Sequence, residues 1–361
     1  MRYGPSLSAL RTLSLFLLLL TVPPSIGTAG EDIWTGIERV VAVGDVHGDY
    51  DQFVTVLRSA ELIDADGNWV GGKAHLVQTG DIVDRGAGSR KAMDLLMRLE
   101  EEAAKAGGAV HALIGNHEAM NLYGDLRYVF PEEFAAYRDA DSEKARDELY
   151  KEEQKLFPDR KRWDANHPLG FAEHRRAFGP EGKYGKWIRG HNAVVRIDGT
   201  LFLHGGISPK LVDWSVRQIN ERVRAELQDF AKLEDGIVQN ENGPLWYRGL
   251  AQGNEKALED HLRKLLFNFK VDRIAIGHTF TKGAITPRFD GKVLMIDIGL
   301  SRFFDEKGRM ACLVIEKGKP YALHRGKKLD LPWNAEGDLE RYIKQTGELD
   351  REAKPAEPLK R

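Results

Sequence analysis

The sequence has a single cysteine, Cys312, so no disulfide can form within the chain and a disulfide framework is excluded. Charge of one sign is not in excess either, because 53 Lys and Arg stand against 55 Asp and Glu, a formal net charge of −2. Such a balance gives no reason to expect nucleic acid or an anionic membrane surface as a partner. Cys312 also lies outside any His-Cys-x-x-x-x-x-Arg pattern, within the apolar run 311–315, which predicts a core residue rather than a nucleophile.

Long apolar runs are scarce, and the clearest one occupies residues 13–22, near the N-terminus. Arg2 and Arg11 flank it on the N-terminal side, two prolines end it, and small residues follow. This order is typical of a secretory signal peptide, so we predict that residues 1–30 form one, with cleavage near Ala29. A transmembrane anchor is the alternative, but a span needs about 20 apolar residues and this run is shorter.

A signal peptide predicts an exported protein, periplasmic or secreted, with no stable membrane anchor once the signal is cleaved. No cysteine lies near the cleavage site to carry a lipid anchor. Export without disulfides suits a bacterial periplasm better than a disulfide-rich extracellular setting.

The rest of the chain has the composition of a globular protein with a sizeable core, with 42% hydrophobic and 30% charged residues among 361. No internal linker or long-period repeat interrupts it. We therefore predict one domain over residues 31–345. The charged, proline-containing residues 346–361 are expected to form a flexible tail.

Three similar motifs dominate the first third of this domain. They are Gly-Asp-Val-His-Gly at 44–48, Gly-Asp-Ile-Val-Asp-Arg-Gly at 80–86 and Gly-Asn-His-Glu at 115–118. Each follows an apolar run that reads as a buried strand, and segments with helical spacing lie between the runs. This is a β-α-β-α-β pattern, which builds a parallel sheet whose ligands bind beyond the carboxyl ends of the strands.

Further strands are expected after residue 190. Residues 193–197 and 200–203 read as a hairpin, and the strands 273–276, 293–296 and 310–316 follow, with amphipathic helices at 212–233 and 256–269. Between the two strand regions, residues 121–190 are aromatic and charged without a clear strand. We interpret this segment as a helical insertion over the active-site edge, a lid or specificity cap. The alternative is a helical layer on the back of the sheet.

Polar side chains follow five of these strands, where they can converge on one edge. Three offer carboxylate or amide oxygens and three offer imidazoles: Asp45, Asp81 and Asn116, then His47, His204 and His278. Singly, each would be assigned to a turn or to a satisfied histidine. Together they suit Mn, Fe or Zn, and six ligands are better matched to two ions bridged by one carboxylate than to one ion.

The motif set resembles the calcineurin-like metallophosphoesterases, and within them the phosphoprotein phosphatase family. The resemblance rests on GDVHG, GDIVDRG, GNHE, LHGG and GHT, and it covers about residues 38–300. The GNHEAMN continuation, the PLWYRG loop and the IDIG segment are most similar to the bacterial Shewanella-like phosphatases. The fold that this resemblance implies is α/β, with a largely parallel core in two packed sheets flanked by helices.

The resemblance also implies a role for each motif residue. Asp45 and His47 would hold a first metal, Asp81 would bridge, and Asn116, His204 and His278 would hold the second. Arg85, Asn116 and Arg248 would bind substrate phosphate. For Arg248 the alternative is a loop arginine packed on Trp246. His117 would be the general acid, oriented by Asp84, and Glu118 would support the strand ends through its hydrogen bonds.

The implied activity is hydrolysis of a phosphomonoester by direct attack of a metal-bound hydroxide, with two divalent ions, Mn²⁺ first and Fe or Zn as alternatives. The expected substrate is a phosphorylated protein or peptide carrying phosphotyrosine, phosphoserine or phosphothreonine. Two alternatives stay open: a small-molecule hydrolase such as a dinucleoside-tetraphosphate hydrolase or nucleotidase, and a catalytically inactive binding module. The sequence leaves the oligomeric state open.

Overall fold

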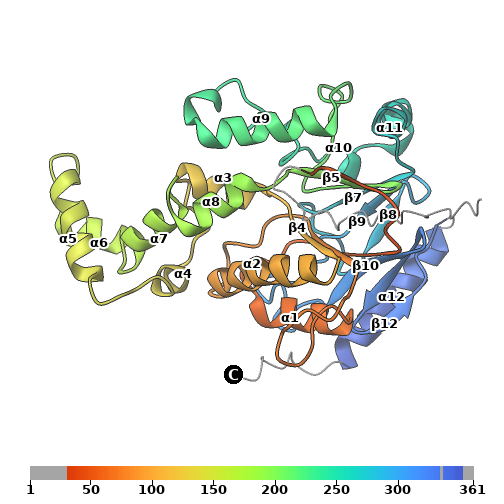
Figure 1. Ribbon diagram of the computed structural model, residues 1–361, viewed down its shortest axis with the longest axis horizontal. Coiled ribbons are helices and arrows are strands. Elements are labelled where there is room, and N and C mark those ends of the chain that lie inside the picture. Colours follow the sequence, from red (N-terminus) through yellow and green to blue (C-terminus); the bar gives the residue numbers. More distant parts are fainter. Residues whose placement is uncertain (1–30, 334–335, 353–361) are drawn as a thin grey trace, which may run out of the picture.

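Two packed six-stranded sheets form the centre of the protein. We describe a computed structural model, in which residues 31–333 and 336–352 are defined. Helices α1, α2 and α12 lie on one side of the sheets and α9 and α11 on the other (Figure 1). This four-layer arrangement agrees with the predicted α/β fold of two packed sheets flanked by helices.

The first sheet holds the strands that end in the three N-terminal motifs. Its order is β12-β11-β10-β2-β3-β4, with β2–β3 and β3–β4 parallel and the other pairs antiparallel. The parallel part is the predicted β-α-β-α-β unit. The strand bounds are β2 Arg39–Val43, β3 His75–Gln78, β4 Ala109–Ala112, β10 Ala311–Glu316, β11 Lys319–His324 and β12 Lys327–Leu329.

The second sheet holds the strands that precede His204, His278 and the IDIG segment. Its order is β1-β5-β6-β7-β9-β8, and β6, β7 and β9 run parallel. The hairpin of β5 and β6 forms as predicted. The bounds are β1 Ile33–Trp34, β5 Val194–Ile197, β6 Thr200–Leu203, β7 Arg273–Ile276, β8 Thr286–Arg288 and β9 Val293–Met295.

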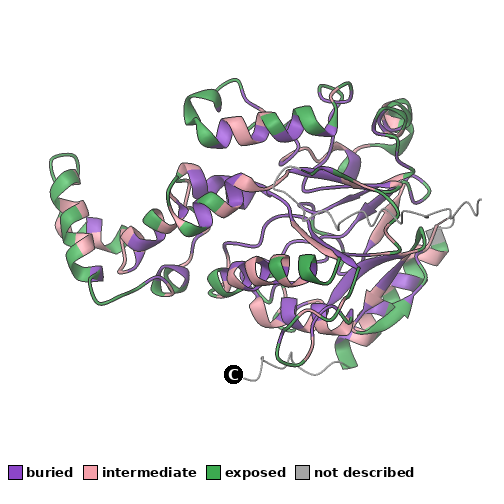
Figure 2. Ribbon diagram, viewed as in Figure 1, coloured by how far each residue is buried: buried purple, intermediate pink, exposed green. Residues whose placement is uncertain are grey.

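The helices that cover the sheets are amphipathic and bury their apolar stripe (Figure 2). In α1, Tyr50–Ser59, the Asp49 side chain caps the first turn and Phe53 and Leu57 are fully buried. Its partner α2, Ser89–Lys105, packs against β4. On the other side lie α9, Val216–Gln228, the short 3₁₀ turn η1, Phe230–Lys232, α10, Gly249–Gln252, and α11, Glu255–Phe269.

The segment 121–190 is helical, as predicted. Its helices are the end of α3, Asn116–Tyr123, then α4 Pro131–Ala135, α5 Ser142–Glu153, α6 Arg160–Asn166, α7 Phe171–Phe178 and α8 Lys183–Gly190. Helices α5 and α6 extend to the left in Figure 1, away from the sheets. At its other end, α8 is tied to α2, because Tyr184 and Lys183 both bond Asp94. The insertion is thus anchored beside the first sheet and projects outward.

The C-terminal prediction needs a correction. Residues 346–352 are not a flexible tail, because they belong to α12, Glu336–Glu352. Asp350 is almost fully buried and accepts hydrogen bonds from His324, Arg309 and Arg325. These contacts hold the last turns of the helix against β11, a stabilisation that the local composition does not reveal. Residues 353–361 lie outside the described residues, as do residues 1–30 with the predicted signal peptide.

Cys312 is a core residue, as expected. It is 1% exposed in β10, and burial raises the pKa of its thiol to about 12, so it is not a thiolate nucleophile. Across residues 31–333 and 336–352, none of the helices combines the length and apolar character that a membrane span requires.

Candidate metal centre and phosphate site

The predicted site residues meet at the carboxyl ends of the parallel strands of both sheets, around a cavity of about 330 Å³. Eight of the ten line this cavity: Asp45, His47, Asp81, Arg85, Asn116, His117, Arg248 and His278. The other two, Asp84 and His204, are fully buried and contact that lining from behind. The site is therefore built jointly by two sheets whose strands come from different parts of the chain.

The glycines in the motifs are explained by close backbone approach. A Cβ on Gly115 would lie 2.3 Å from Asp81 Oδ1, and one on Gly80 would lie 2.5 Å from the Gly115 backbone. Several functional residues also have left-handed backbone conformations: His47, Asp81, Asp84, Arg85 and His278. Such conformations are costly for side-chain-bearing residues and cluster at functional sites, where neighbouring contacts enforce them.

His47 is a neutral ring whose unprotonated nitrogen faces the cavity. Its Nδ1 donates to the carbonyl of Val83 at 3.1 Å, so Nε2 is the unprotonated nitrogen. Burial lowers the pKa of His47 to about 3, which keeps the ring neutral. Nε2 lies 3.8 Å from carboxylate oxygens of both Asp45 and Asp81. A neutral imidazole facing two carboxylates in this way is suited to binding a cation.

A second group converges around His204. Its Nδ1 donates to the carbonyl of Thr79 at 2.9 Å, so Nε2 faces the site. There it meets Asn116 Oδ1 at 2.9 Å, His278 Nδ1 at 3.1 Å and Asp81 Oδ2 at 3.3 Å. Burial lowers the pKa of His204, but Asp81 and Asp45 outweigh it and raise the pKa to about 9. Lone pairs on these neighbouring nitrogen and oxygen atoms repel one another unless a proton or a metal cation lies between them.

The donor set therefore fits two divalent cations. Ligand atoms lie within 4.8 Å of one another in two groups, His47 with Asp81 and His117, and Asp81 with His204 and His278. Asp81 belongs to both, as a bridging carboxylate should. His278 Nε2 is buried without a hydrogen-bond partner. Oxygen and imidazole donors without thiolate match the metals expected from the sequence.

The first group contains His117 where the sequence predicted Asp45. The Asp45 carboxylate instead accepts from the backbone N–H of His278 at 3.0 Å, and burial together with Asp297 raises its pKa well above the usual range. His117 Nε2 lies 3.8 Å from Asp81. Burial lowers the pKa of His117, but Asp81 and the hydrogen bond to Asp84 outweigh it and raise it. A raised pKa favours a protonated ring, which suits His117 to donating a proton from Nε2.

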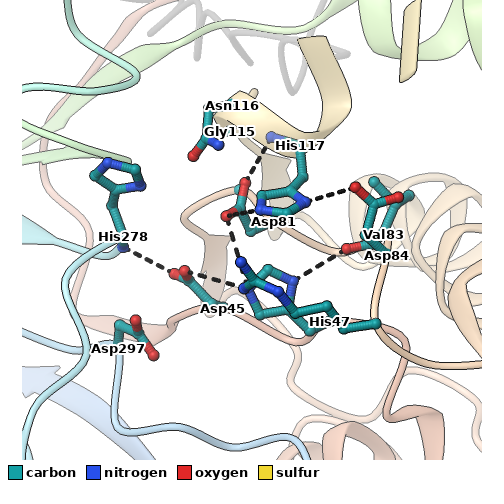
Figure 3. Close-up of polar contacts among 12 residues, drawn as sticks. Asp45, His47, Asp81, Val83, Asp84, Gly115, Asn116, His117, His278 and Asp297 are labelled. Atoms are coloured by element: carbon teal, nitrogen blue, oxygen red, sulfur yellow. Dashed lines mark hydrogen bonds and ion pairs between the residues drawn. The ribbon is translucent and has the colours of Figure 1, made fainter. Parts of the chain in front are cut away.

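His117 and Asp84 form the predicted pair. Nδ1 of His117 lies 2.5 Å from Asp84 Oδ2, as Figure 3 shows. Asn121, which the sequence reading did not assign, donates to the other oxygen of Asp84 at 2.8 Å and to the His117 carbonyl at 3.0 Å. It follows His117 by one helical turn, and that spacing could have suggested its role. The pair is therefore fixed in orientation with Nε2 directed at the cavity.

Glu118 holds the strand ends together, as expected. Its carboxylate accepts from the backbone N–H groups of Gly115, Asp81 and Ile82 at 2.7–2.8 Å. These bonds tie the second motif to the third. Burial opposes ionisation of Asp81 itself, but His204 and His117 hold its pKa well below the usual range, so the bridging carboxylate stays charged.

Two arginines face the same cavity. Arg85 Nη1 donates to His47 Nε2 at 2.6 Å. Arg248 Nη1 donates to the carbonyl of His278 and to Thr279 Oγ1 at 2.7 and 2.9 Å. Arg248 lines the cavity together with Trp246, so it is placed to reach a bound anion. Guanidinium groups on one cavity with a metal centre suit a phosphate group.

The structure adds lining residues that the sequence reading missed: Tyr128, Trp246, Gln252, Thr279, Phe280, Asp297 and Phe304. Asp297 lies beside Asp45 in Figure 3, and burial raises its pKa to about 6. It follows β9 in the IDIG segment, so its place after a strand was a signal available in the sequence. The aromatic residues had no such signal. Of residues 121–190, Tyr128 alone lines the cavity.

Comparison with known proteins agrees with this geometry. The family model described as calcineurin-like phosphoesterase matches residues 38–281, and the chain belongs to this family. With its paired ligand groups, it is a metal-dependent phosphoric monoester hydrolase.

Individual proteins similar to this chain include phosphatases and a solved structure. The chain is 31% identical over 287 residues to Shewanella-like protein phosphatase 2 of Arabidopsis thaliana, covering 73% of this chain and 72% of the relative. An uncharacterised protein of Schizosaccharomyces pombe is 32% identical over 308 residues, covering 81% and 82%. The crystal structure of a cold-active protein-tyrosine phosphatase of a psychrophilic Shewanella species has a TM-score of 0.65 at 30% identity, covering 85% and 84%.

Proposed function

We propose that this enzyme is a protein phosphatase that hydrolyses phosphotyrosine and phosphoserine or phosphothreonine in proteins or peptides. The observation that carries the proposal is the cavity in which the shared Asp81 lies beneath two arginines and the His117–Asp84 pair. The similarity to a Shewanella-like protein phosphatase and to a protein-tyrosine phosphatase supports a phosphoprotein substrate.

Asp45, His47 and Asp81 would hold one metal, and Asp81, Asn116, His204 and His278 the other. When bound, the two ions supply a nucleophilic water at neutral pH and neutralise phosphoryl charge. We propose Mn²⁺ as the metal, with Fe and Zn as the alternatives, because the donors are carboxylate, amide and imidazole.

The residues of the chain bind and orient the phosphoryl group. Arg85 lies in the loop after β3 and Arg248 in the loop before α10, and each guanidinium group can take two phosphoryl oxygens. His117 lines the same cavity as the two arginines, so its ring can reach the ester oxygen of a phosphate held there. Positioning and charge stabilisation account for most of the catalysis of phosphoryl transfer.

His117 would protonate the leaving oxygen. In the hydrolysis, the oxygen of a water molecule bonds to phosphorus and the bond from phosphorus to the ester oxygen breaks. The departing oxygen takes the proton of Nε2, and the proton that the water loses restores the protonated ring. Asp84 holds Nδ1, so the proton to be donated is on the nitrogen that faces the cavity. Asp84 also stabilises the protonated ring before the transfer.

Two alternative functions were set beside the protein phosphatase, and they are separated from it by different observations. An inactive binding module is disfavoured, because both ligand groups and the acid pair are in place. A small-molecule hydrolase on the same scaffold would be distinguished from a protein phosphatase by the substrate that it hydrolyses fastest. The test is turnover of matched phosphotyrosine, phosphothreonine and phosphoserine peptides, a nucleoside monophosphate and a dinucleoside tetraphosphate, each with Mn²⁺, Zn²⁺ or Fe²⁺. Peptide kcat/KM below that for the nucleotides would overturn the proposal.

We also propose that the protein is exported to the periplasm or secreted, on the strength of the N-terminal sequence alone. The measurement is the mass of the intact protein recovered from a bacterial periplasmic fraction. A mature chain that begins near residue 30 is expected, and an uncleaved chain confined to the cytoplasm would contradict it.

A further inference from the structure

An aromatic wall borders the cavity. Tyr128, Phe280 and Phe304 line the cavity, and Phe303 completes the wall by packing against Phe304. Phe280 and Phe304 stack with ring centroids 5.6 Å apart and an angle of 17°, and Phe303 meets Phe304 edge-on at 5.1 Å. Tyr128 packs on the ring of His117 at 4.9 Å. The four residues come from three segments: the insertion, the loop after β7 and the loop after β9. No motif predicted this cluster.

The wall surrounds the arginine that faces the phosphate. The Arg85 guanidinium carbon lies 5.1 Å from the ring centroid of Tyr128, 5.4 Å from that of Phe304 and 5.8 Å from that of Phe303. Such cation–π contacts confine the guanidinium without neutralising it. A phosphate held by Arg85 therefore has these rings as the immediate neighbours of its ester group.

The wall is exposed although it is apolar. Phe280, Phe303 and Phe304 are 53%, 51% and 39% exposed. Phe280 and Phe304 line the cavity, and both Phe280 and Phe303 pack against Phe304. Clustered apolar side chains in water, beside a site with polar groups at its base, indicate a surface that is covered by a ligand.

The rings are also held in place before any ligand arrives. Arg302 binds Asp49 through two hydrogen bonds of 2.8 and 2.6 Å, which fixes the start of the loop bearing Phe303 and Phe304. Asp49 is itself buried as the cap of α1. Phe280 packs on Gly299, where a Cβ would lie 2.1 Å from its ring. A surface fixed in this way loses little entropy on binding.

We propose that the aromatic wall determines the specificity of this site, by receiving the flat leaving group of an aryl phosphomonoester against Phe280 and Phe304. The inference rests on the proposed function, since it takes the same cavity as the phosphatase site. Among phosphorylated protein side chains, phosphotyrosine is the one with such a group. An alkyl leaving group such as that of phosphoserine reaches the same Arg85 but is too short to cover the rings.

The first experiment measures binding without turnover. Isothermal titration of the Mn²⁺-loaded protein with phenylphosphonate and with methylphosphonate compares an aryl and an alkyl ligand with the same charge. Ring stacking adds a contribution that corresponds to about tenfold in affinity. We expect phenylphosphonate to bind about tenfold more tightly. Phe280 is not among the rings that pack on Arg85, so Phe280→Leu should remove that advantage while the Kd of methylphosphonate changes less than twofold.

Matched variants exclude a general loss of structure. Phe280→Tyr keeps a ring and should retain the preference. Phe267→Leu changes a phenylalanine that is 82% exposed on α11, outside the cavity lining, and should alter neither Kd. Equal losses for both ligands in Phe280→Leu, or no preference in the unmodified protein, would overturn the proposal.

The second experiment uses two peptides that differ only in phosphotyrosine or phosphoserine. Phe280→Leu should raise KM for the phosphotyrosine peptide about tenfold and leave that for the phosphoserine peptide nearly unchanged. If no phosphopeptide is turned over, the proposed function fails while the phosphonate comparison still tests the wall. If both peptides are turned over and Phe280→Leu changes them equally, the wall proposal fails and the proposed function stands.

Discussion

Replacing His117 by asparagine tests the assignment of the general acid. An acid matters in proportion to how poor the leaving group is. The serine alkoxide is a very poor leaving group, the phenolate of tyrosine (pKa about 10) is a better one, and nitrophenolate is better still. His117→Asn should therefore slow hydrolysis of phosphoserine most, phosphotyrosine less and nitrophenyl phosphate least.

The expected loss of rate differs between the two residues of the acid pair. General acid catalysis is typically worth ~10²–10⁴-fold, which sets the loss for phosphoserine. Asp84→Asn leaves the imidazole in place but removes a charged partner at 2.5 Å. A hydrogen bond to a charged group contributes about 1.5–3 kcal/mol, so this variant should lose roughly tenfold to a hundredfold on phosphoserine, with the same order among substrates.

The assay is kcat for the three substrates, measured together with bound metal by mass spectrometry. The control is His191→Asn, which breaks a histidine–carboxylate pair of the same kind, His191 with Glu100 at 3.1 Å, outside the cavity lining. His117 also lies within ligand distance of His47 and Asp81. Loss of metal with an equal penalty on all three substrates would therefore make His117 a ligand and refute the acid role.

Three further predictions concern metal binding and stability. Asp81→Asn removes the charge shared by both ligand groups, so metal stoichiometry and turnover should fall together; two tightly bound metals at a near-normal rate would refute the bridging assignment. Asp350→Asn should lower the free energy of unfolding at pH 7 by about 2 kcal/mol, since burial raises the pKa of Asp350 but His324, Arg309 and Arg325 hold it at about 2, and this difference should vanish as the pH falls from about 4 to 2. Urea unfolding measures it, with Asp338→Asn on the same helix as the exposed control. Burial and the charge of Asp84 raise the pKa of Glu133 from 4.5 to about 8, so its native form retains a proton that the unfolded chain releases, and its effect on stability becomes unfavourable as the pH rises from about 4.5 to 8. The stability of Glu133→Gln relative to the unmodified protein should thus increase over that pH range, and a constant difference in unfolding midpoint would contradict the pKa.

Much of the fold could be predicted because its signals are local. Strands β2, β3, β6 and β7 appear within a residue or two of the apolar runs at 40–43, 74–77, 200–203 and 273–276. A buried parallel strand needs a short run of apolar residues, and such a run is recognised from adjacent residues in the sequence. The motif glycines are visible in the sequence, but the reason for Gly115 is tertiary, since Asp81 of the second motif lies too close for a side chain at this position.

Other features depend on pairings between distant residues. Strand β10 joins the first sheet antiparallel to β2, and β1 pairs with β5, across separations that no local pattern encodes. The last turns of α12, residues 346–352, had the composition of a flexible tail, and the buried contacts of Asp350 with His324, Arg309 and Arg325 order them. Register and packing set such contacts, and both are properties of the assembled chain.

The site divides along the same line. The sequence by itself predicted the metal ligands, the acid pair and the phosphate arginines, because this chemistry restricts residue type and most of these residues lie just after a strand. Arg248 is the exception, since it lies in the loop before α10. Only the tertiary structure decided that Asp297 lies beside Asp45 and that Tyr128, Phe280 and Phe304 border one cavity. A phenylalanine in a loop has no local signature of function, since its role comes from the side chains that folding places around it.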